Sequence, residues 1–274
     1  MYWGDKIADE IAIKFKDKIA SGQPLIIRDE KTMSGRVHVG SLRGVVIHGI
    51  ISQILTEQKI ANRYLFEIND FDPFDGLPIY LDANVYKPYM GRILNEVPSP
   101  DPAFPNFAEY VADEFVKVVE KTGFTPELYR SSTLYLEGKF NETIKLTLDN
   151  GDKIREIYKR ISGSDKDAEW LPVQVVCEKC HKIGTTKAVA WDGEKVTYRC
   201  EKNLVKWAEG CGHVGKVSPF DGKAKMPWKV EWAAKWKVLN VDIEGAGKDH
   251  STKGGAREVS AAIAKEVFGY SNPF

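Results

Sequence analysis

Apolar residues recur at a helical spacing from the start of the chain. Four of them lie four residues apart and share one face of a helix: Ile7, Ile11, Phe15 and Ile19. Ser21-Gly22 follows as a stop signal, and the short run Leu25–Arg28 predicts a strand after it. We therefore expect an amphipathic helix that leads into a buried strand.

Later segments alternate between the patterns of strands and of helices. Strands are predicted at Tyr64–Ile68, Thr125–Arg130 and Val238–Glu244, and helices at Val45–Leu55, Phe107–Thr122, Phe140–Ile161 and Gly255–Phe268. This alternation is typical of an α/β fold with a parallel sheet. The segment Asn69–Pro105 is rich in Pro, Asp and Gly, and a connection of this length predicts an ordered functional loop.

A change in composition near Ser162 divides the chain. From Val173 to about Pro219 the pattern is β-rich, with Trp191-Asp-Gly-Glu as a hairpin turn, and helix, strand and helix return from Trp228. The length of 274 residues and the 43% hydrophobic content allow about two domains. We expect a main domain made of residues 1–165 and 220–274, with an inserted module at 166–219.

A glycine-containing loop, Thr32 to Gly44, joins the first predicted strand to the next helix, where nucleotides bind in α/β folds. Ser34-Gly35 allows a tight turn, Gly40 lets a flat group approach the backbone, and His38 lies beside the helix N-terminus. A P-loop is disfavoured because no lysine follows Gly40. For His38 alone, helix capping or packing under the loop is the competing interpretation.

A second loop of this kind, Gly245–His250, follows the predicted strand Val238–Glu244. Two such loops would face one ligand across the carboxyl edge of a parallel sheet. Asp249 is suited to ribose hydroxyls or an ammonium, and His250 to a phosphate or carboxylate. The alternatives are that Asp249 caps the following helix and that His250 lies on the surface.

The cysteines indicate a structural metal site. Cys177 and Cys180 have the spacing that lets two thiolates reach one metal, and Cys200 and Cys211 would complete a four-thiolate zinc site. Ten residues separate the second pair, where a zinc ribbon usually has about two to four. His181, His213 or a nearby carboxylate therefore remain alternative ligands, and free thiols remain the alternative to zinc.

Charge and hydropathy are those expected of a cytoplasmic protein. Lys plus Arg equals Asp plus Glu at 39 each, which excludes a global cationic field, so an RNA partner would need a local basic patch. Such a patch is a candidate in the module: Lys182, Lys187, Lys195, Arg199, Lys202, Lys206 and Lys216. Neither a signal peptide nor an apolar run of about 18 residues is evident, so no membrane span is expected.

Four segments together resemble the catalytic domain of class I lysyl-tRNA synthetases: Asp29–Arg43, Ile68–Pro78, Trp228–Trp236 and Gly245–Gly255. Within them, His38-Val-Gly-Ser41 resembles the HIGH motif of class I synthetases, and Met33 stands where proline is frequent. The resemblance implies a Rossmann-type nucleotide-binding domain with an inserted zinc-ribbon-like module. It also implies a lysine--tRNA ligase, which activates lysine with ATP and Mg²⁺ and transfers the lysyl group to tRNA(Lys).

The resemblance also implies site residues. Catalytic roles would belong to His38, Ser41 and His250. ATP would be bound by Thr32, Ser34, Gly35, His38, Gly40, Ser41, Gly247, Asp249 and His250. Lysine would be bound by Thr32, Asp70, Asp72, Glu231, Trp232 and Asp249, with carboxylates for its ammonium groups and an indole for its stem. Because Trp228, Trp232 and Trp236 also describe one helix face, at least one of them is expected in the core.

Members of the family carry a KMSKS-type lysine loop and an anticodon-binding region beyond the helix that corresponds to Gly255–Phe268. We therefore expect this chain to be an N-terminal portion with little activity of its own, with anticodon contacts made by a region it lacks. An incomplete gene, a shortened polypeptide and one piece of a split enzyme all remain open. The alternatives in function are another class I synthetase, such as a glutamyl enzyme, and a non-catalytic RNA-binding or accessory module.

Overall fold

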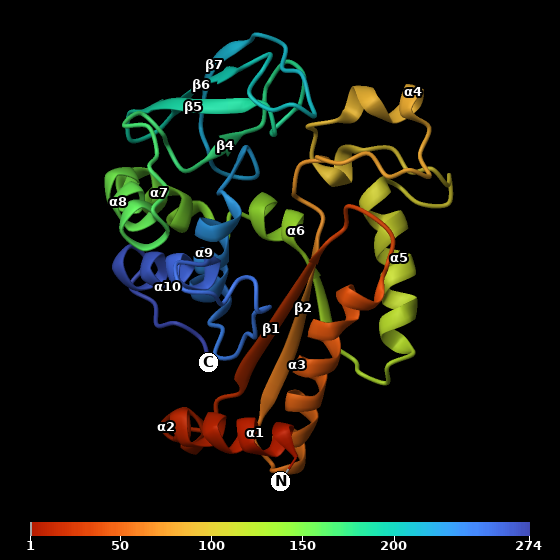
Figure 1. Cartoon of the computed structure of the whole chain (residues 1–274), viewed down its shortest axis with the longest axis vertical. Helices are drawn as coiled ribbons and strands as arrows, with labels where there is room; N and C mark the ends of the chain where they lie inside the picture. Colours follow the sequence, from red (N-terminus) through yellow and green to blue (C-terminus); the bar gives the residue numbers. More distant parts are fainter. Residues whose placement is uncertain (1) are drawn as a thin grey trace.

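A parallel sheet runs through the centre of the computed structural model, which describes residues 2–274 (Figure 1). Its strands are β1 (Leu25–Thr32), β2 (Asn62–Asn69) and β3 (Glu127–Arg130), in the order β1-β2-β3. On the other edge of β1, Ile243 forms a parallel bridge with Ile27. Beyond it, Phe274 donates to Asp242 O at 2.8 Å and accepts from Glu244 N at 3.1 Å. The predicted α/β class with a parallel sheet is confirmed.

Side chains alternate between the two covered faces of this sheet. Ile27 and Phe66 belong to the core on the first face, whereas Ile26 and Leu65 belong to the core on the second face, which α9 (Trp228–Leu239) covers. Because β1 and β2 pair with Arg28 opposite Leu65 and Glu30 opposite Glu67, three charged side chains stand on the second face. The register therefore places charge inside the molecule.

The N-terminal helices lie on the first face and at the base of the molecule (Figure 1). They are α1 (Trp3–Lys14), α2 (Lys16–Ala20) and α3 (Val39–Glu57). The single helix predicted over Ile7–Ile19 is interrupted at Phe15, whose φ of −107° and ψ of 22° leave the helical region. Ser21-Gly22 ends α2 as predicted, with Gly22 at a φ of 75°.

By length and composition alone α3 is apolar enough to cross a membrane, and one such helix is weak evidence for a membrane span. It packs along β1, β2 and α1, and Val45, Ile51 and Leu55 are buried there. One face of α3 packs against the sheet, and 33% of its apolar window is buried.

The long connection after β2 is ordered and contributes to the core. It contains α4 (Ala83–Tyr86) and two 3-10 turns, η1 (Lys87–Tyr89) and η2 (Leu94–Glu96), and leads into α5 (Phe107–Glu120). Phe74 and Leu94 from this connection are fully buried. Asn106 begins α5 by accepting from Glu109 N at 2.9 Å. The expectation of an ordered segment is confirmed, although the sequence did not predict its helical turns.

Three helices follow β3: α6 (Ser131–Leu136), α7 (Asn141–Asp149) and α8 (Gly151–Ser162). The sequence predicted one helix over Phe140–Ile161. Asn150 divides it, with a φ of −115° and a ψ of 28°. The helix α6, which covers the second face near the carboxyl end of β2, was not predicted at all.

A small β region stands above α9 in Figure 1. Its antiparallel sheet has the order β5-β6-β7, formed by Thr186–Trp191, Val196–Cys200 and Val214–Val217. A separate pair joins β4 (Gln174–Val175) to β8 (Ala224–Lys225). The pairing of Trp191 with Val196 confirms the predicted hairpin turn.

The chain then returns to the second face with α9 (Trp228–Leu239) and α10 (Ala256–Glu266), which pack on each other. The strand predicted over Val238–Glu244 does not form: α9 runs to Leu239, Asn240 then adopts a left-handed conformation with φ 52°, and only an isolated bridge at Ile243 remains. Only Val241–Glu244 reaches β1, through Asp242 N and Ile243 N to Ile26 O at 2.9 and 3.0 Å.

Candidate functional site

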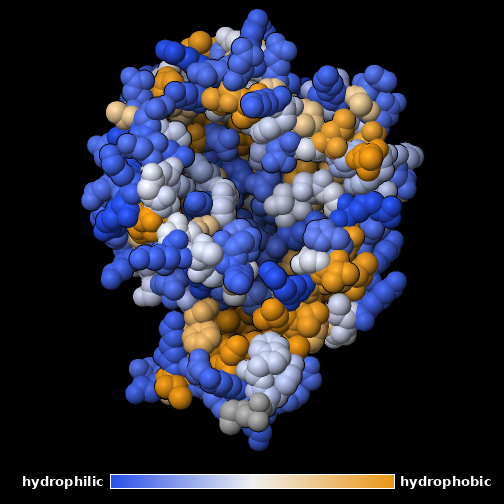
Figure 2. Space-filling model, viewed as in Figure 1, coloured by the Kyte–Doolittle hydropathy of each residue, from blue (hydrophilic) through white to orange (hydrophobic). Residues whose placement is uncertain are grey.

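A cavity of about 1030 Å³ lies at the carboxyl end of β1. It is enclosed by the ends of β1 and β2, the start of α9, the Gly245–His250 loop and the β region. Figure 2 shows it as a hollow with a hydrophilic floor. The neighbours of β1 are β2 on one side and Val241–Glu244 on the other, so the chain order reverses here, and open α/β sheets bind ligands at such a point.

Carboxylates outnumber cations around this cavity. Seven acidic residues line it: Asp29, Glu30, Asp72, Asp75, Asp167, Glu231 and Glu244. The lysines that line it are Lys166, Lys187 and Lys225, and its described lining contains no arginine. Burial raises the pKa of Asp75. The surplus of negative charge suits a cationic ligand better than an anionic one.

The floor of the cavity is a network of buried ion pairs built on Arg28, whose side chain is fully buried. Its guanidinium lies 2.6 Å from Glu67 Oε2 and 2.5 Å from Glu244 Oε1, and it also pairs with Glu30. Tyr129 accepts from Arg28 Nε at 2.9 Å and donates to Glu67 at 2.8 Å. Arg28 thus joins β1, β2, β3 and the Val241–Glu244 segment.

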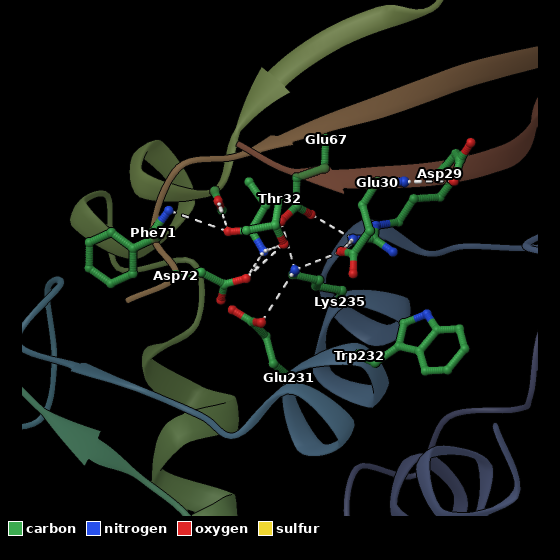
Figure 3. A network of polar contacts seen from close by, with 12 residues as sticks. Asp29, Glu30, Thr32, Glu67, Phe71, Asp72, Glu231, Trp232 and Lys235 are labelled. Atoms are coloured by element: carbon green, nitrogen blue, oxygen red, sulfur yellow. Dashed lines mark hydrogen bonds and ion pairs between the residues drawn. The ribbon is translucent and has the colours of Figure 1, made fainter. Parts of the chain in front are cut away.

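Lys235 of α9 extends the network toward the cavity. Its ammonium lies 2.9 Å from Glu30, 2.6 Å from Glu67 and 3.4 Å from Glu231, as Figure 3 shows. Burial opposes its charge, yet the surrounding carboxylates outweigh burial and raise the pKa of Lys235 well above its usual value. Although burial alone would raise it, Lys235 and Arg28 hold the pKa of Glu30 well below its usual range.

A second lysine, Lys225 of β8, joins Asp72 to Glu231. Its Nζ lies 3.1 Å from Asp72 Oδ1 and also pairs with Glu231, and these two carboxylates outweigh burial and raise the pKa of Lys225. Asp72 accepts from Thr32 Oγ1 at 2.8 Å and from Asn69 Nδ2 at 2.9 Å (Figure 3). Thr32, Asp72 and Glu231, which lie far apart in the sequence, are therefore brought together.

The tryptophans of α9 divide between core and cavity. Trp236 is fully buried, which confirms the expectation that at least one packs in the core, while Trp232 and Trp228 line the cavity. Trp232 and Trp236 both donate their indole N–H to Glu244, at 2.9 and 2.7 Å. Burial raises the pKa of Glu244, while Arg28 acts against this. Trp232 and Trp228 stack at 6.1 Å and form an aromatic wall.

The residues predicted in the first loop separate into two groups. Thr32 and Ser34 line the cavity. Among the described residues, Gly35, His38, Gly40 and Ser41 lie outside its lining. His38 is exposed at the start of α3, and its ring folds over Gly40, where a Cβ would lie 2.9 Å from it.

The second loop divides in the same way. Gly247 and His250 line the cavity, and the His250 ring lies 5.4 Å from that of Trp228. The side chain of Asp249 is 76% exposed, and Asp249 is not among the described residues that line the cavity.

Asp70 is placed away from this cavity. It accepts from Ser132 N at 2.8 Å, from Ser132 Oγ at 2.5 Å and from Ser131 Oγ at 3.2 Å. These bonds satisfy the first turn of α6, so the carboxylate has a structural partner. Asp70 instead borders a smaller cavity beside α5.

Sequence reasoning missed Arg28, Glu30, Glu67, Lys225 and Lys235. A signal was present, because Arg28-Asp-Glu-Lys31 places four charges in a strand whose first three residues are apolar. Charges in a strand covered on both faces must find partners, since an unpaired buried charge is very costly. The sequence did not reveal which partners those would be.

The four cysteines gather at one point. Their Sγ atoms lie within 4.8 Å of one another, with Cys177 and Cys211 at 3.7 Å and Cys180 and Cys200 also at 3.7 Å. A tetrahedral site with Zn–S bonds of about 2.3 Å requires sulfurs about 3.8 Å apart. Cys211 N and Thr185 Oγ1 each lie 3.3 Å from the Cys200 sulfur. This donor set fits a four-thiolate metal site.

Comparison with known proteins identifies relatives along the whole chain. The family model described as tRNA synthetases class I (K) matches residues 1–274. A lysine--tRNA ligase of Methanocaldococcus jannaschii is 33% identical over 275 residues, and one of Methanosphaera stadtmanae is 31% identical over 274. Each alignment covers 100% of this chain and 49% of the relative, so the chain spans about half the length of these curated relatives. The chain therefore belongs to the class I (K) family of tRNA synthetases.

Proposed function

We propose that this chain forms the ATP- and lysine-binding part of a class I lysine--tRNA ligase. The observation that carries the proposal is the cavity at the end of β1, which both glycine-containing loops border and which carboxylates dominate. The reaction we propose is attack of the lysine carboxylate on the α-phosphate of ATP, which displaces pyrophosphate and forms lysyl-adenylate. The lysyl group then passes to the terminal adenosine of tRNA(Lys) in the cytoplasm, and AMP is released. The names of the relatives support this reaction class.

We infer that lysine binds between Asp72 and the tryptophan wall. Asp72 keeps 23% of its side chain exposed, whereas Glu231 is 3% exposed and lies beneath Lys225 and Lys235. Asp72 would therefore contact an ammonium directly, with Thr32 orienting it, and Glu231 would act through the two lysines. Trp232 would cover the aliphatic stem.

ATP, with Mg²⁺, would occupy the side of the cavity formed by Ser34, Gly247 and His250. His38 and Ser41, at the N-terminus of α3, would reach the phosphates from the rim, where the helix dipole favours anions. Gly35, Gly40 and Asp249 would also contact the nucleotide at this rim. The contribution of these groups is alignment and charge stabilisation.

For the β region, we propose a zinc-ribbon-like module at residues 166–219, inserted into a Rossmann-type domain made of 1–165 and 220–274. A zinc ion would be held by Cys177, Cys180, Cys200 and Cys211. The match between the 3.7 Å sulfur separations and a tetrahedron supports this. Four thiolates leave no open coordination position, so the metal would have a structural role.

Calorimetry with non-hydrolysable lysyl- and glutamyl-adenylate analogues tests the substrate. Lysyl-adenylate should bind and glutamyl-adenylate should bind at least about tenfold more weakly, because its carboxylate would face a cavity with a surplus of acids. Asp72→Asn should remove this preference, and Asp75→Asn, at the same cavity, serves as the matched control. A preference for the glutamyl analogue would overturn the lysine assignment, and binding of neither analogue would favour a non-catalytic RNA-binding role.

A further inference from the structure

A buried histidine behind the cavity wall joins two of the elements that form it. His48 lies on α3 and is 4% exposed. Its Nε2 lies 2.8 Å from the Gly245 amide nitrogen. On the other side of the ring, Nδ1 lies 2.9 Å from the Gly44 carbonyl and 3.3 Å from Asp29 Oδ2. Asp29 and Gly245 both line the cavity, from β1 and from the second loop.

These contacts determine the tautomer of the ring. An amide N–H is only a donor, so Nε2 must present its lone pair to Gly245. Nδ1 then carries the hydrogen, and it faces two acceptors, the Gly44 carbonyl and the Asp29 carboxylate. The ring that holds the loop is therefore neutral.

Two glycines make this arrangement possible. A Cβ at Gly44 would overlap the Asp29 carboxylate, and a Cβ at Gly245 would lie 3.3 Å from His48 Nε2. The absence of side chains at both positions lets Asp29, His48 and the Gly245 backbone approach one another in line.

We propose that His48 is a positioning residue for the cavity: its unprotonated Nε2 holds the Gly245 amide and sets the Gly245–Gly247 loop against the end of β1. The loop follows Glu244, whose carbonyl accepts from Arg257 Nη1 at 2.5 Å. Gly245 is the next residue, and its amide is held by His48 of α3. The proposal depends on the proposed function only in that ATP is used as a probe.

A proton and the Gly245 amide compete for the same lone pair. The groups that face the ring are Asp29 from β1, Tyr64 from β2 and Glu244 from the segment before the loop. Burial lowers the pKa of His48, but Asp29 and Glu244 outweigh it and raise this pKa above its usual value. Burial raises the pKa of Tyr64, which stays neutral. The loop is therefore held above the pKa of His48 and released as pH falls through it.

Amide hydrogen exchange of the full chain, followed by NMR between about pH 5 and 8, tests this directly. Protection of the Gly245 amide, corrected for intrinsic exchange, should fall about tenfold toward the acid end in the wild type. His48→Gln, whose Oε1 can still accept, should keep protection and lose the pH response. His48→Leu should lose protection at every pH. Equal protection in His48→Leu and wild type would overturn the proposal.

A second variant keeps the test valid if His48→Leu fails to fold. Asp29→Asn removes the charge that favours the imidazolium, so the acid release of Gly245 should move to lower pH, by about one unit. An unmoved midpoint would contradict the proposal. ATP affinity of the wild type should follow Gly245 protection, and that of His48→Gln should not. If ATP binds at no pH while Gly245 protection still responds, the proposed function fails and the role of His48 stands.

Discussion

Two regions of this molecule bury clusters of polar side chains, and the charges of the two clusters are balanced in different ways. Beneath the cavity, Arg28, Lys225 and Lys235 contact five carboxylates: Glu30, Glu67, Asp72, Glu231 and Glu244. In the β region, four thiols converge within 4.8 Å. The first cluster brings its own counter-ions, with Arg28 on β1, Lys225 on β8 and Lys235 on α9. The second is a donor set, which we propose to be completed by a metal ion.

Because of this difference, the two regions need different things in order to fold. A network of internal ion pairs is lost when one partner is removed, because the other charge stays buried. A thiolate site is lost when the metal is removed, because metal binding is part of the folding free energy. The two regions should therefore respond to different perturbations, and each perturbation should leave the other region largely intact.

Loss of the metal should have the largest effect. In a strong chelator, or in Cys177→Ser, the strands β5 to β7 should lose hydrogen-exchange protection, since structural zinc contributes on the order of 10 kcal/mol. β1 and β2 should stay protected. Metal analysis should find about one zinc per wild-type chain. His181→Asn, next to the cluster in sequence, is the matched control, and bound zinc with an intact β region in Cys177→Ser would contradict the site.

Removal of Arg28 should be the next largest effect and should act on the main sheet. Arg28→Met leaves Glu67 and Glu244 buried without their guanidinium, which should lower the free energy of unfolding by about 3 to 5 kcal/mol. Arg63→Met breaks a solvent-exposed pair with Glu127 and should cost less than about 1 kcal/mol. Urea unfolding of both variants compares them, and equal losses would show that burial of the network is unimportant.

A substitution outside both clusters should separate ligand binding from stability. His38→Ala should weaken ATP binding by about 2 kcal/mol, the value of a hydrogen bond to a charged group. Because the side chain is exposed, the free energy of unfolding should change by less than about 0.5 kcal/mol. Calorimetry and thermal unfolding give the two values, with His213→Ala in the β region as control. Equal losses would favour the capping or packing role.

The smallest effect should be a difference in acid response within the first cluster. The pKa of Glu30 is lowered in the folded chain, so its contribution is present above the unfolded pKa of about 4.3 and is lost as pH falls. Glu30→Gln should therefore flatten the fall in stability below about pH 4.3. The pKa of Glu244 is raised, so its protonation adds stability as pH falls from this raised pKa toward about 4.3, and Glu244→Gln should remove that gain and steepen the fall in stability above about pH 4.3. Urea midpoints measured against pH decide this, and slopes that change in the same direction would contradict the assignment.

Local patterns were sufficient where the evidence lay within a few residues. The strand–loop–helix at Thr32–Gly44, the hairpin at Trp191 and the termination at Ser21-Gly22 were all predictable, because turn chemistry and periodicity act locally. Helix boundaries were less predictable: Phe15 and Asn150 interrupt helices that hydrophobic periodicity would continue. Such breaks depend on what each helix packs against.

The sequence by itself determined the α/β alternation, the two loops at the carboxyl ends of strands and the approach of Cys177 to Cys180. Tertiary structure decided the partners. Parallel register put Glu30 opposite Glu67, and the packing of α9 then placed Lys235 between them. Tertiary structure also brought Cys200 close to Cys211 across the ten residues between them, and it placed Asp70 where it accepts a hydrogen bond from Ser132 N of α6. The physical reason is that buried charges and thiols are satisfied by whichever groups the fold brings near, at separations along the chain that no local pattern records.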